Sequence, residues 1–375
     1  MHQAASRRRR ILLLAYSLDI GGMERVILDL AHGLDPSRFE VFIGCIGRAG
    51  EWAGTFRYPN NLRVFGHEGR PNLRLLREVA GWARACGVDL VHSHNSSGLV
   101  FGYPVARWLR LPIVHTMHGH DRGADGHRLL DWVEGWMSRH VDLYVPVSLE
   151  LEAIHARRVL PVLNGVKVPG RLAPSAGGSA AGFTIGAVGR MVPLKNHALL
   201  LEVFARLVRD YPNARLELLG AGPELPRLRE SADRLGISLS CRFHGAEGEV
   251  GRFLGRCDIF VLPSLSEGTS VALLEAMAKG RICIASDVGG NRGVIQHLHD
   301  GLLFASEDGH DLFDKLVWAM ERLGTEEGEQ MRRNAWRTVA IRFPLEGMIE
   351  AYRRIYEELL RAGSDVRSVD PGGAE

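Results

Sequence analysis

The sequence has few cysteines, few aromatic residues and no long apolar run. Its 375 residues include 5 cysteines, and no two of them form a Cys-x-x-Cys pair. Scattered cysteines are typical of reduced thiols, so a disulfide framework and a zinc ribbon are both excluded as the basis of the fold. No apolar stretch approaches the length of a membrane span, and the one that follows the arginines at residues 7–10 is too short for a signal peptide. We therefore expect a cytoplasmic protein.

Net charge is also nearly absent. The 46 basic and 44 acidic residues leave a formal charge of +2, which argues against nucleic acid or another acidic polymer as a partner. Lysine is missing from residues 1–165, where 20 arginines stand against 16 acidic residues. This modest basic excess is concentrated at residues 7–10 and 70–84. It favours peripheral contact between the first half of the chain and the inner face of a membrane.

Short apolar runs alternate with amphipathic segments along the whole chain. With 46% hydrophobic and 24% charged residues, the composition is that of a globular protein long enough for two domains. Strands that alternate with helices predict mainly parallel sheets covered on both faces. The fold class is therefore α/β, with two Rossmann-like domains and a cleft between them. The predicted strands are residues 11–16, 39–46, 62–65, 90–94, 113–117, 141–147, 184–188, 215–219, 240–243, 258–262 and 282–285.

A change in composition separates the two halves. Between residues 165 and 182 the chain is rich in Pro, Gly, Ser and Ala and shows no periodicity, which is typical of a linker. The predicted organisation is an N-terminal domain at residues 1–165, a linker at 166–182, a C-terminal domain at 183–342, a helix at 343–362 that returns to the first domain, and a disordered tail at 363–375.

Residues 264–280 follow a buried strand and combine two carboxylates with a helix start. Thr269 or Ser270 is the expected N-cap, and the free N–H groups of the first turn form a site for an anion. Glu267 precedes this turn and Glu275 lies in the second, where carboxylates could accept hydrogen bonds from vicinal sugar hydroxyls. Both glutamates could equally be solvated surface charges, and these residues alone leave the two interpretations open.

A basic loop follows the first strand of the second half. Arg190 and Lys195 stand in a Gly-led turn that enters a helix, an arrangement suited to a diphosphate. The Walker and Gly-x-Gly-x-x-Gly patterns are both absent. A solvated basic loop would contain the same residues. Two glycine-rich turns, at residues 21–22 and 220–222, also follow strands.

Five histidines gather near the ends of two predicted strands in the first half: His92, His94, His115, His118 and His120. A metal site is one explanation of such a cluster. The spacing lacks a His-Glu-x-x-His pattern, and hydrogen bonding to substrate or backbone is the explanation that we favour. We expect His118, which precedes a glycine, to face the cleft.

Taken together, these segments resemble retaining glycosyltransferases of family 4, which have the GT-B fold. The resemblance runs from about residue 11 to about residue 360. Its most specific part is a Glu-x7-Glu motif, in which Glu267 and Glu275 stand in register. The matching segments are ILLLAYSLDIGGMERVILDLA, TMHGHD, VLNGVKVP, GRMVPLKNH, LLGAGPE, RFHGA and DIFVLPSLSEGTSVALLEAMAKG.

The resemblance implies roles for individual residues. Glu267 matches the glutamate that contacts the hexose of the donor, and Glu275 the one that holds the ribose. Arg190 and Lys195 match the pair that grips the diphosphate and neutralises the departing nucleotide. These four residues imply transfer from a nucleotide diphosphate sugar with retention of configuration, and no metal or other cofactor.

Five further positions match the same pattern. The N–H groups of Ser270 and Val271 correspond to donors to the phosphates, and Gly22 to a glycine loop that closes over the donor. His118 corresponds to a histidine against the transferred sugar, and Phe243 to the seat of the nucleobase. The sequence departs from the family at Gly293, where an acidic residue is usual, which leaves the seat of the donor sugar open.

The resemblance does not identify the substrates. The donor is expected to be a UDP-, GDP- or ADP-sugar, and the acceptor a glycan, a lipid-linked glycan or a small metabolite or natural product. A GT-B epimerase or phosphorylase, a histidine-based metalloenzyme and a non-catalytic sugar-nucleotide binding protein are the alternative functions.

Overall fold

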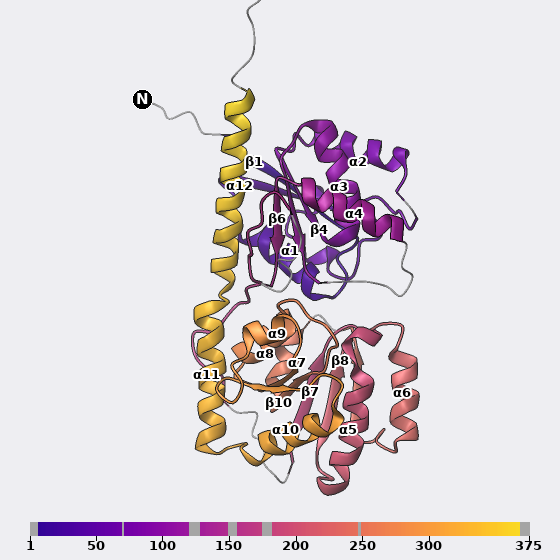
Figure 1. The fold of residues 1–375 in the computed structure, drawn as a ribbon, viewed down its shortest axis with the longest axis vertical. Coiled ribbons are helices and arrows are strands. Elements are labelled where there is room, and N and C mark those ends of the chain that lie inside the picture. The colour runs from indigo at the N-terminus through magenta and orange to yellow at the C-terminus, as the bar shows by residue number, and fades with distance from the viewer. Residues whose placement is uncertain are drawn as a thin grey trace, which may run out of the picture. The chain divides into compact units, whose positions relative to one another are not determined.

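The computed structural model describes residues 7–69, 71–119, 128–148, 156–174, 182–246 and 249–367. The chain divides into two compact units, each built on a six-stranded sheet whose strand pairs are parallel. Unit 1 comprises Met1–Asp19, Met23–Leu163 and Glu346–Glu375, and unit 2 comprises Ile20–Gly22 and Asn164–Leu345. The α/β class and the parallel sheets predicted from the alternating pattern are confirmed (Figure 1).

The sheet of unit 1 has the strand order β3-β2-β1-β4-β5-β6. Its strands are short apolar runs, as expected for a sheet covered on both faces. They are β1 (Arg9–Ala15), β2 (Phe39–Cys45), β3 (Leu62–Val64), β4 (Leu90–His94), β5 (Ile113–Met117) and β6 (Leu143–Pro146). The helices of unit 1 are α1 (Gly22–Gly33), α2 (Leu73–Ala85), α3 (Asn95–Leu109), α4 (Arg128–His140) and α12 (Leu345–Arg367). The first residues of α1 and α12 group with unit 2.

Helices cover both faces of this sheet. Buried side chains of α2 and α3 join those of β1 and β4, including Val91, in one hydrophobic cluster. Successive strand residues point to opposite faces, so the neighbouring His92 lies on the other face. There it contacts Tyr352 and Tyr356 of α12. The helix that follows unit 2 therefore packs on the sheet of unit 1.

Two buried tyrosines attach α12 to the sheet by hydrogen bonds. The hydroxyl of Tyr356 lies 2.6 Å from Nδ1 of His92, whose Nε2 lies 2.8 Å from Oγ1 of Thr116. That same Oγ1 is 3.0 Å from the hydroxyl of Tyr352. Burial lowers the pKa of His92 well below its ordinary value, so the ring is neutral. Each of its nitrogens thus has one hydroxyl partner.

Removal of one of these hydroxyls should destabilise unit 1. Tyr356→Phe leaves Nδ1 of His92 buried without a partner, and we expect a loss of about 1–3 kcal/mol in the free energy of unfolding, measured with urea. The control is Tyr58→Phe, which removes a hydroxyl from a side chain that is 39% exposed. Equal stability of the two variants would show that the buried contact contributes nothing.

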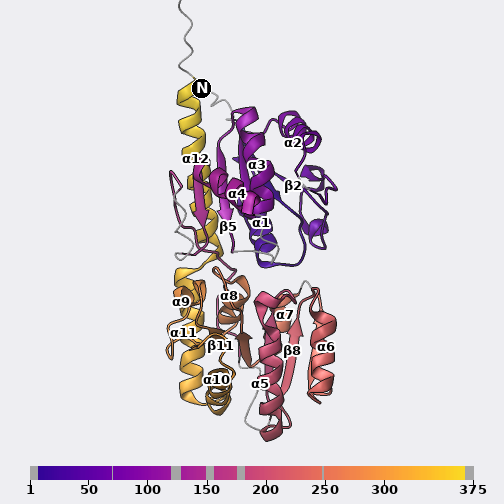
Figure 2. The ribbon, with the colours of Figure 1, turned by 45° about the vertical axis from the view of Figure 1, so that its right-hand side comes forward.

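The sheet of unit 2 has the order β12-β11-β10-β7-β8-β9. Its strands are β7 (Thr184–Val188), β8 (Arg215–Leu219), β9 (Cys241–Gly245), β10 (Ile259–Leu262), β11 (Ile282–Ser286) and β12 (Leu302–Phe304). Its helices are α5 (His197–Asp210), α6 (Leu225–Arg234), α7 (Val250–Arg256), α8 (Val271–Ala278), α9 (Gly290–Val294), α10 (Gly309–Glu321) and α11 (Glu326–Arg342). Figure 2 shows α5, α6 and α10 along the outside of this unit.

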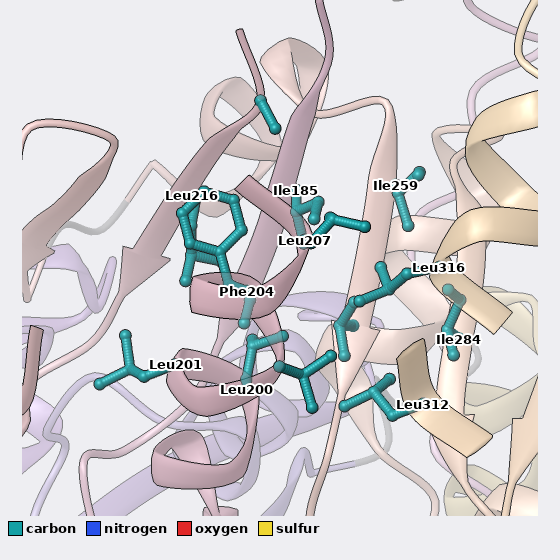
Figure 3. Close-up of a cluster of buried hydrophobic side chains, with 14 of the residues drawn as sticks. Ile185, Leu200, Leu201, Phe204, Leu207, Leu216, Ile259, Ile284, Leu312 and Leu316 are labelled. Carbon is teal, nitrogen blue, oxygen red and sulfur yellow. The ribbon is translucent and has the colours of Figure 1, made fainter. Parts of the chain in front are cut away.

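The core of unit 2 lies between its sheet and the helices α5 and α10. Figure 3 shows Phe204 and Leu207 of α5 beside the strand residues Leu216 and Ile185, and Leu312 of α10 belongs to the same cluster. All five are fully buried. The apolar spacing along α5 thus gives that helix a single buried face, which fixes how it lies on the sheet.

Three sequence expectations differ from the structure. Helix α9 and strand β12 were not predicted, because elements of five and three residues are too short to show a period. The final helix does not end at residue 362 but continues to Arg367, so residues 363–367 of the expected disordered tail are helical. Apolar spacing also predicts a helix at residues 149–158, but the described residues 156–158 are not helical and the others lie outside the described residues. The linker at 166–182 lies partly outside the described residues too, whereas residues 164–174 and 182 group with unit 2.

The strand order reverses at one place in each sheet. In unit 1 it reverses between β1 and β4, and in unit 2 between β10 and β7. Loops that leave the carboxyl ends of the strands beside such a point are where open α/β sheets bind ligands. In unit 2 these loops carry Arg190 and Lys195 after β7, and Glu267 after β10.

Candidate active site

The basic loop of unit 2 is held in place by backbone contacts to the next loop. Met191 donates its N–H to Ala221 over 2.8 Å and accepts from Glu224 over 2.9 Å. A Cβ at Gly220 would lie 1.9 Å from the carbonyl oxygen of Gly189, and this glycine has a φ of +149°. The glycine turn at residues 220–222 therefore allows two loops to touch through their backbones, a role that sequence reasoning did not assign to it.

Lys195 and Glu267 come together from the two loops beside the reversal in strand order. Nζ of Lys195 lies 2.5 Å from Oε1 of Glu267, and the same oxygen accepts a hydrogen bond of 2.6 Å from the hydroxyl of Ser264. The lysine side chain is 19% exposed and the glutamate side chain 9%. An ammonium has three donors, so Lys195 keeps capacity for an anion beside Glu267. Arg190, in the same loop, is exposed.

Two glycines support the backbone of Glu267 from the loop after β11. Gly290 donates its N–H to the carbonyl oxygen of Glu267 over 2.9 Å. Gly289 has a φ of +44°, and a Cβ there would lie 2.2 Å from the same oxygen. Consecutive glycines after a strand could have indicated this contact, which sequence reasoning did not predict. The position of the Glu267 carboxylate thus depends on glycine at a neighbouring loop.

Helix α8 begins directly after this loop. Ser270 is its N-cap and accepts a hydrogen bond from the N–H of Leu273, which confirms the predicted cap, and Gly280 after the helix has a φ of +64°. Val271, the first helical residue, is buried, and Glu275 in the second turn is half-buried. The Nδ2 of Asn164 donates 2.7 Å to the carbonyl oxygen of Thr269 and anchors the entry to the helix.

Four histidines of unit 1 lie on β4 and β5 or directly after β5. Of these, His94 and His118 are hydrogen-bonded to each other, whereas His115 bonds to Ser93. His92, His94 and His115 are fully buried on adjacent strands, and Nδ1 of His94 lies 3.0 Å from Nε2 of His118. The ring centroids of His92 and His94 are 4.1 Å apart, because alternate residues of one strand share a face. Burial lowers the pKa of His118 to about 3 and of His115 to about 4. These rings are therefore neutral at physiological pH.

The backbone of His118 is also held. Its N–H donates 2.8 Å to Oδ1 of Asn95, which has a φ of +51°, a conformation that Asn tolerates better than most residues. Sequence reasoning missed Asn95 and the role of His94. A signal was present in the sequence, because His94 ends a predicted strand and the polar Asn95 follows it directly.

Two family models together match most of the chain. One, described as Glycosyl transferases group 1, matches residues 179–338, and the other, described as Glycosyltransferase Family 4, matches residues 20–163. The D-inositol 3-phosphate glycosyltransferase of Corynebacterium jeikeium is 32% identical over 86% of this chain and 82% of its own length. The chain belongs to glycosyltransferase family 4. It is a glycosyltransferase with the GT-B fold of two Rossmann-like domains.

A further relative and one solved structure show the range of similarity to this glycosyltransferase. The UDP-Gal:alpha-D-GlcNAc-diphosphoundecaprenol alpha-1,3-galactosyltransferase of Escherichia coli is 24% identical over 61% of this chain and 65% of its own length. Anabaena Alr3699/HepE, solved in complex with UDP-glucose, superposes with a TM-score of 0.81 at 19% identity, over 93% of this chain and 99% of that one. At this identity the likeness supports the GT-B fold.

The structure also locates three further positions that the sequence comparison singled out in this glycosyltransferase. Gly22 is the first residue of α1 and groups with unit 2. Phe243 lies on β9, where its half-buried ring packs against the core of unit 2 and 5.9 Å from the guanidinium carbon of Arg229. Gly293 lies in α9, and a Cβ there would meet no atom within 4 Å.

Two features are absent from the described part of the chain. No three His, Cys, Asp or Glu side chains there are grouped so as to hold a metal ion, although His120 lies outside that part. No helix within the same residues is long and apolar enough to cross a membrane.

Proposed function

We propose that this family 4 enzyme transfers a hexose-type residue from a nucleotide diphosphate sugar to an acceptor hydroxyl, with retention of configuration. The observation that carries the proposal is the contact between Lys195 and Glu267 at the carboxyl ends of β7 and β10, beside the start of α8. A cation for the diphosphate and a carboxylate for the sugar are thus neighbours, as a nucleotide sugar requires.

The reaction requires that donor and acceptor are positioned and that the charge on the leaving diphosphate is stabilised. Arg190 and Lys195 would neutralise the charge that develops on the leaving diphosphate, and the free N–H groups of Ser270 and Val271 would add donors. The leaving phosphate would accept the proton of the acceptor hydroxyl on the face from which it departs. With this positive charge supplied by the protein, we propose that no divalent metal is needed, and activity should persist in excess EDTA.

We propose further that the acceptor belongs to polysaccharide or lipid-linked glycan synthesis. One relative is named for a diphosphoundecaprenol acceptor, and another for inositol 3-phosphate, so a small-metabolite acceptor is the second candidate. Exposed tryptophans at 108, 132 and 136 on α3 and α4 favour peripheral membrane contact by unit 1. Co-sedimentation with anionic vesicles, which should fall when all three are replaced by alanine, tests that contact.

A thermal-shift screen with UDP-, GDP- and ADP-sugars tests the donor. Binding to the native state raises Tm, so the donor base should stand out at saturating concentration. Incubation of the matching sugar with and without candidate acceptors then separates transfer from epimerisation and phosphorolysis. NMR of the product reports the anomeric configuration. If no nucleotide sugar raises Tm or reacts, the proposal is wrong.

Glu275→Gln tests the ribose contact. Loss of charge-assisted hydrogen bonds, which contribute roughly 1.5–3 kcal/mol each, should raise the donor Kd at least tenfold, measured by titration calorimetry. Glu230→Gln, on the exposed part of α6, is the matched control and should leave Kd unchanged. Donor affinity equal to that of the wild type in Glu275→Gln would refute the assignment.

A further inference from the structure

His118 is held from two directions by consecutive residues at the end of β4. His94, the last residue of that strand, lies with Nδ1 3.0 Å from Nε2 of His118, and the two ring planes are inclined by 29°. Asn95 accepts the N–H of His118 over 2.8 Å. The side chain and the backbone of His118 are thus both attached to the end of β4, although His118 itself follows β5.

The hydrogen bonds of His118 limit what it can present to a substrate. Burial lowers the pKa of His118 to about 3 and that of His94 well below its ordinary value, so each ring is neutral with one donor and one acceptor nitrogen. Because Nε2 of His118 is engaged by His94, Nδ1 is the ring nitrogen that remains for a substrate. Whether Nδ1 donates or accepts depends on which of the two rings carries the shared proton.

The surroundings of His94 favour one arrangement. Its Nε2 has no hydrogen-bond partner among the described residues. His92, whose ring centroid lies 4.1 Å from that of His94, already has a partner at each nitrogen. Nδ1 of His118 is likewise buried without a partner among the described residues, so in either arrangement one of these two nitrogens carries an N–H without an acceptor. A buried N–H without an acceptor is rare. With a sugar bound as in the proposed function, an oxygen of that sugar can accept the N–H of His118, whereas no described group can accept one at Nε2 of His94. The proton of His94 is then expected on Nδ1, donating to His118, which leaves the proton of His118 on its own Nδ1.

We propose that His94 is a positioning residue that fixes the orientation and tautomer of His118, so that His118 presents Nδ1–H as a hydrogen-bond donor to an oxygen of the substrate. The inference rests on the proposed function and on the resemblance by which His118 corresponds to a histidine against the transferred sugar. In this arrangement His118 stabilises an oxygen and does not remove a proton.

The first test measures the tautomer directly. Long-range proton–nitrogen NMR spectra of the full-length protein labelled with 15N-histidine report which nitrogen of each ring carries the proton. We expect His118 in the Nδ1–H form in the wild type and in His94→Asn, whose amide can still donate to Nε2. His94→Phe should give a mixture of tautomers. An Nε2–H form in the wild type would overturn the proposal.

The second test measures catalysis with the nucleotide sugar found by the thermal-shift screen. His94→Phe should lower kcat at least tenfold while the donor KM stays within twofold, and His94→Asn should recover kcat to within about threefold of the wild type. Thr116→Val removes a buried hydrogen bond to His92 on the same sheet and leaves the hydrogen bond between His94 and His118 in place. It should lower stability and leave kcat within twofold.

The outcomes separate the two proposals. An active wild type with unchanged kcat and unchanged His118 signals in His94→Phe would overturn the role of His94 alone. A wild type that transfers no sugar would overturn the proposed function, while the NMR comparison would still decide the role of His94. If His94→Phe does not fold, the same comparison is made between His94→Asn and His94→Gln, whose longer amide should not reproduce the contact at Nδ1.

Discussion

Replacement of Lys195 by alanine should lower kcat at least tenfold while unit 2 remains folded. The variant loses an ammonium that would contribute roughly 1.5–3 kcal/mol of charge-assisted hydrogen bonding to the leaving diphosphate. Steady-state kinetics with the nucleotide sugar identified by the thermal-shift screen measures the effect, and circular dichroism confirms the fold. A kcat within twofold of the wild type would show that the diphosphate is not bound at this loop.

The chain offers a matched control for this variant. Lys315 pairs with Asp311 over 3.1 Å on α10 and is 25% exposed, close to the 19% of Lys195. Lys315→Ala should cost no more than about 0.5 kcal/mol of stability and leave kcat within twofold. Adding Glu267→Gln to Lys195→Ala removes the unpaired carboxylate and should recover stability without recovering kcat.

Gly289→Ala should reduce both stability and activity. The added Cβ would lie 2.2 Å from the carbonyl oxygen of Glu267, at a residue with φ of +44° and ψ of −137°. We expect a loss of about 2–4 kcal/mol in the free energy of unfolding, because backbone strain and displacement of the Glu267 loop add together. Because that loop carries the carboxylate assigned to the donor sugar, kcat should fall as well. Urea unfolding and steady-state kinetics measure the two effects.

Gly293→Ala is the control from the same segment. It lies in α9 with open space around its Cβ position, so alanine should be neutral or stabilise the protein by up to about 1 kcal/mol. If Gly289→Ala were as stable and active as Gly293→Ala, the close approach of Gly289 to Glu267 would not matter for stability or activity. This pair therefore separates the conformational requirement at one glycine from the general effect of replacing glycine.

Sequence reasoning was most reliable where a residue acts through its local backbone. Ser270 caps α8 as predicted, and Gly280 ends it, because capping depends on residues within one turn. The short elements α9 and β12 were missed, since they are positioned by the surrounding sheet and carry no pattern of their own. The glycine turn at residues 220–222 was recognised, but the sequence could not show that it touches the basic loop.

The amino-acid sequence by itself determined the α/β class, the division into two Rossmann-like domains and the family, because apolar periodicity and the Glu-x7-Glu motif are local properties of the chain. The tertiary structure decided which residues meet. Lys195 and Glu267 are 72 residues apart, and His94 and His118 are 24 apart. Each pair is brought together because parallel strands end at one edge of a sheet, and only the order of those strands decides which loops become neighbours.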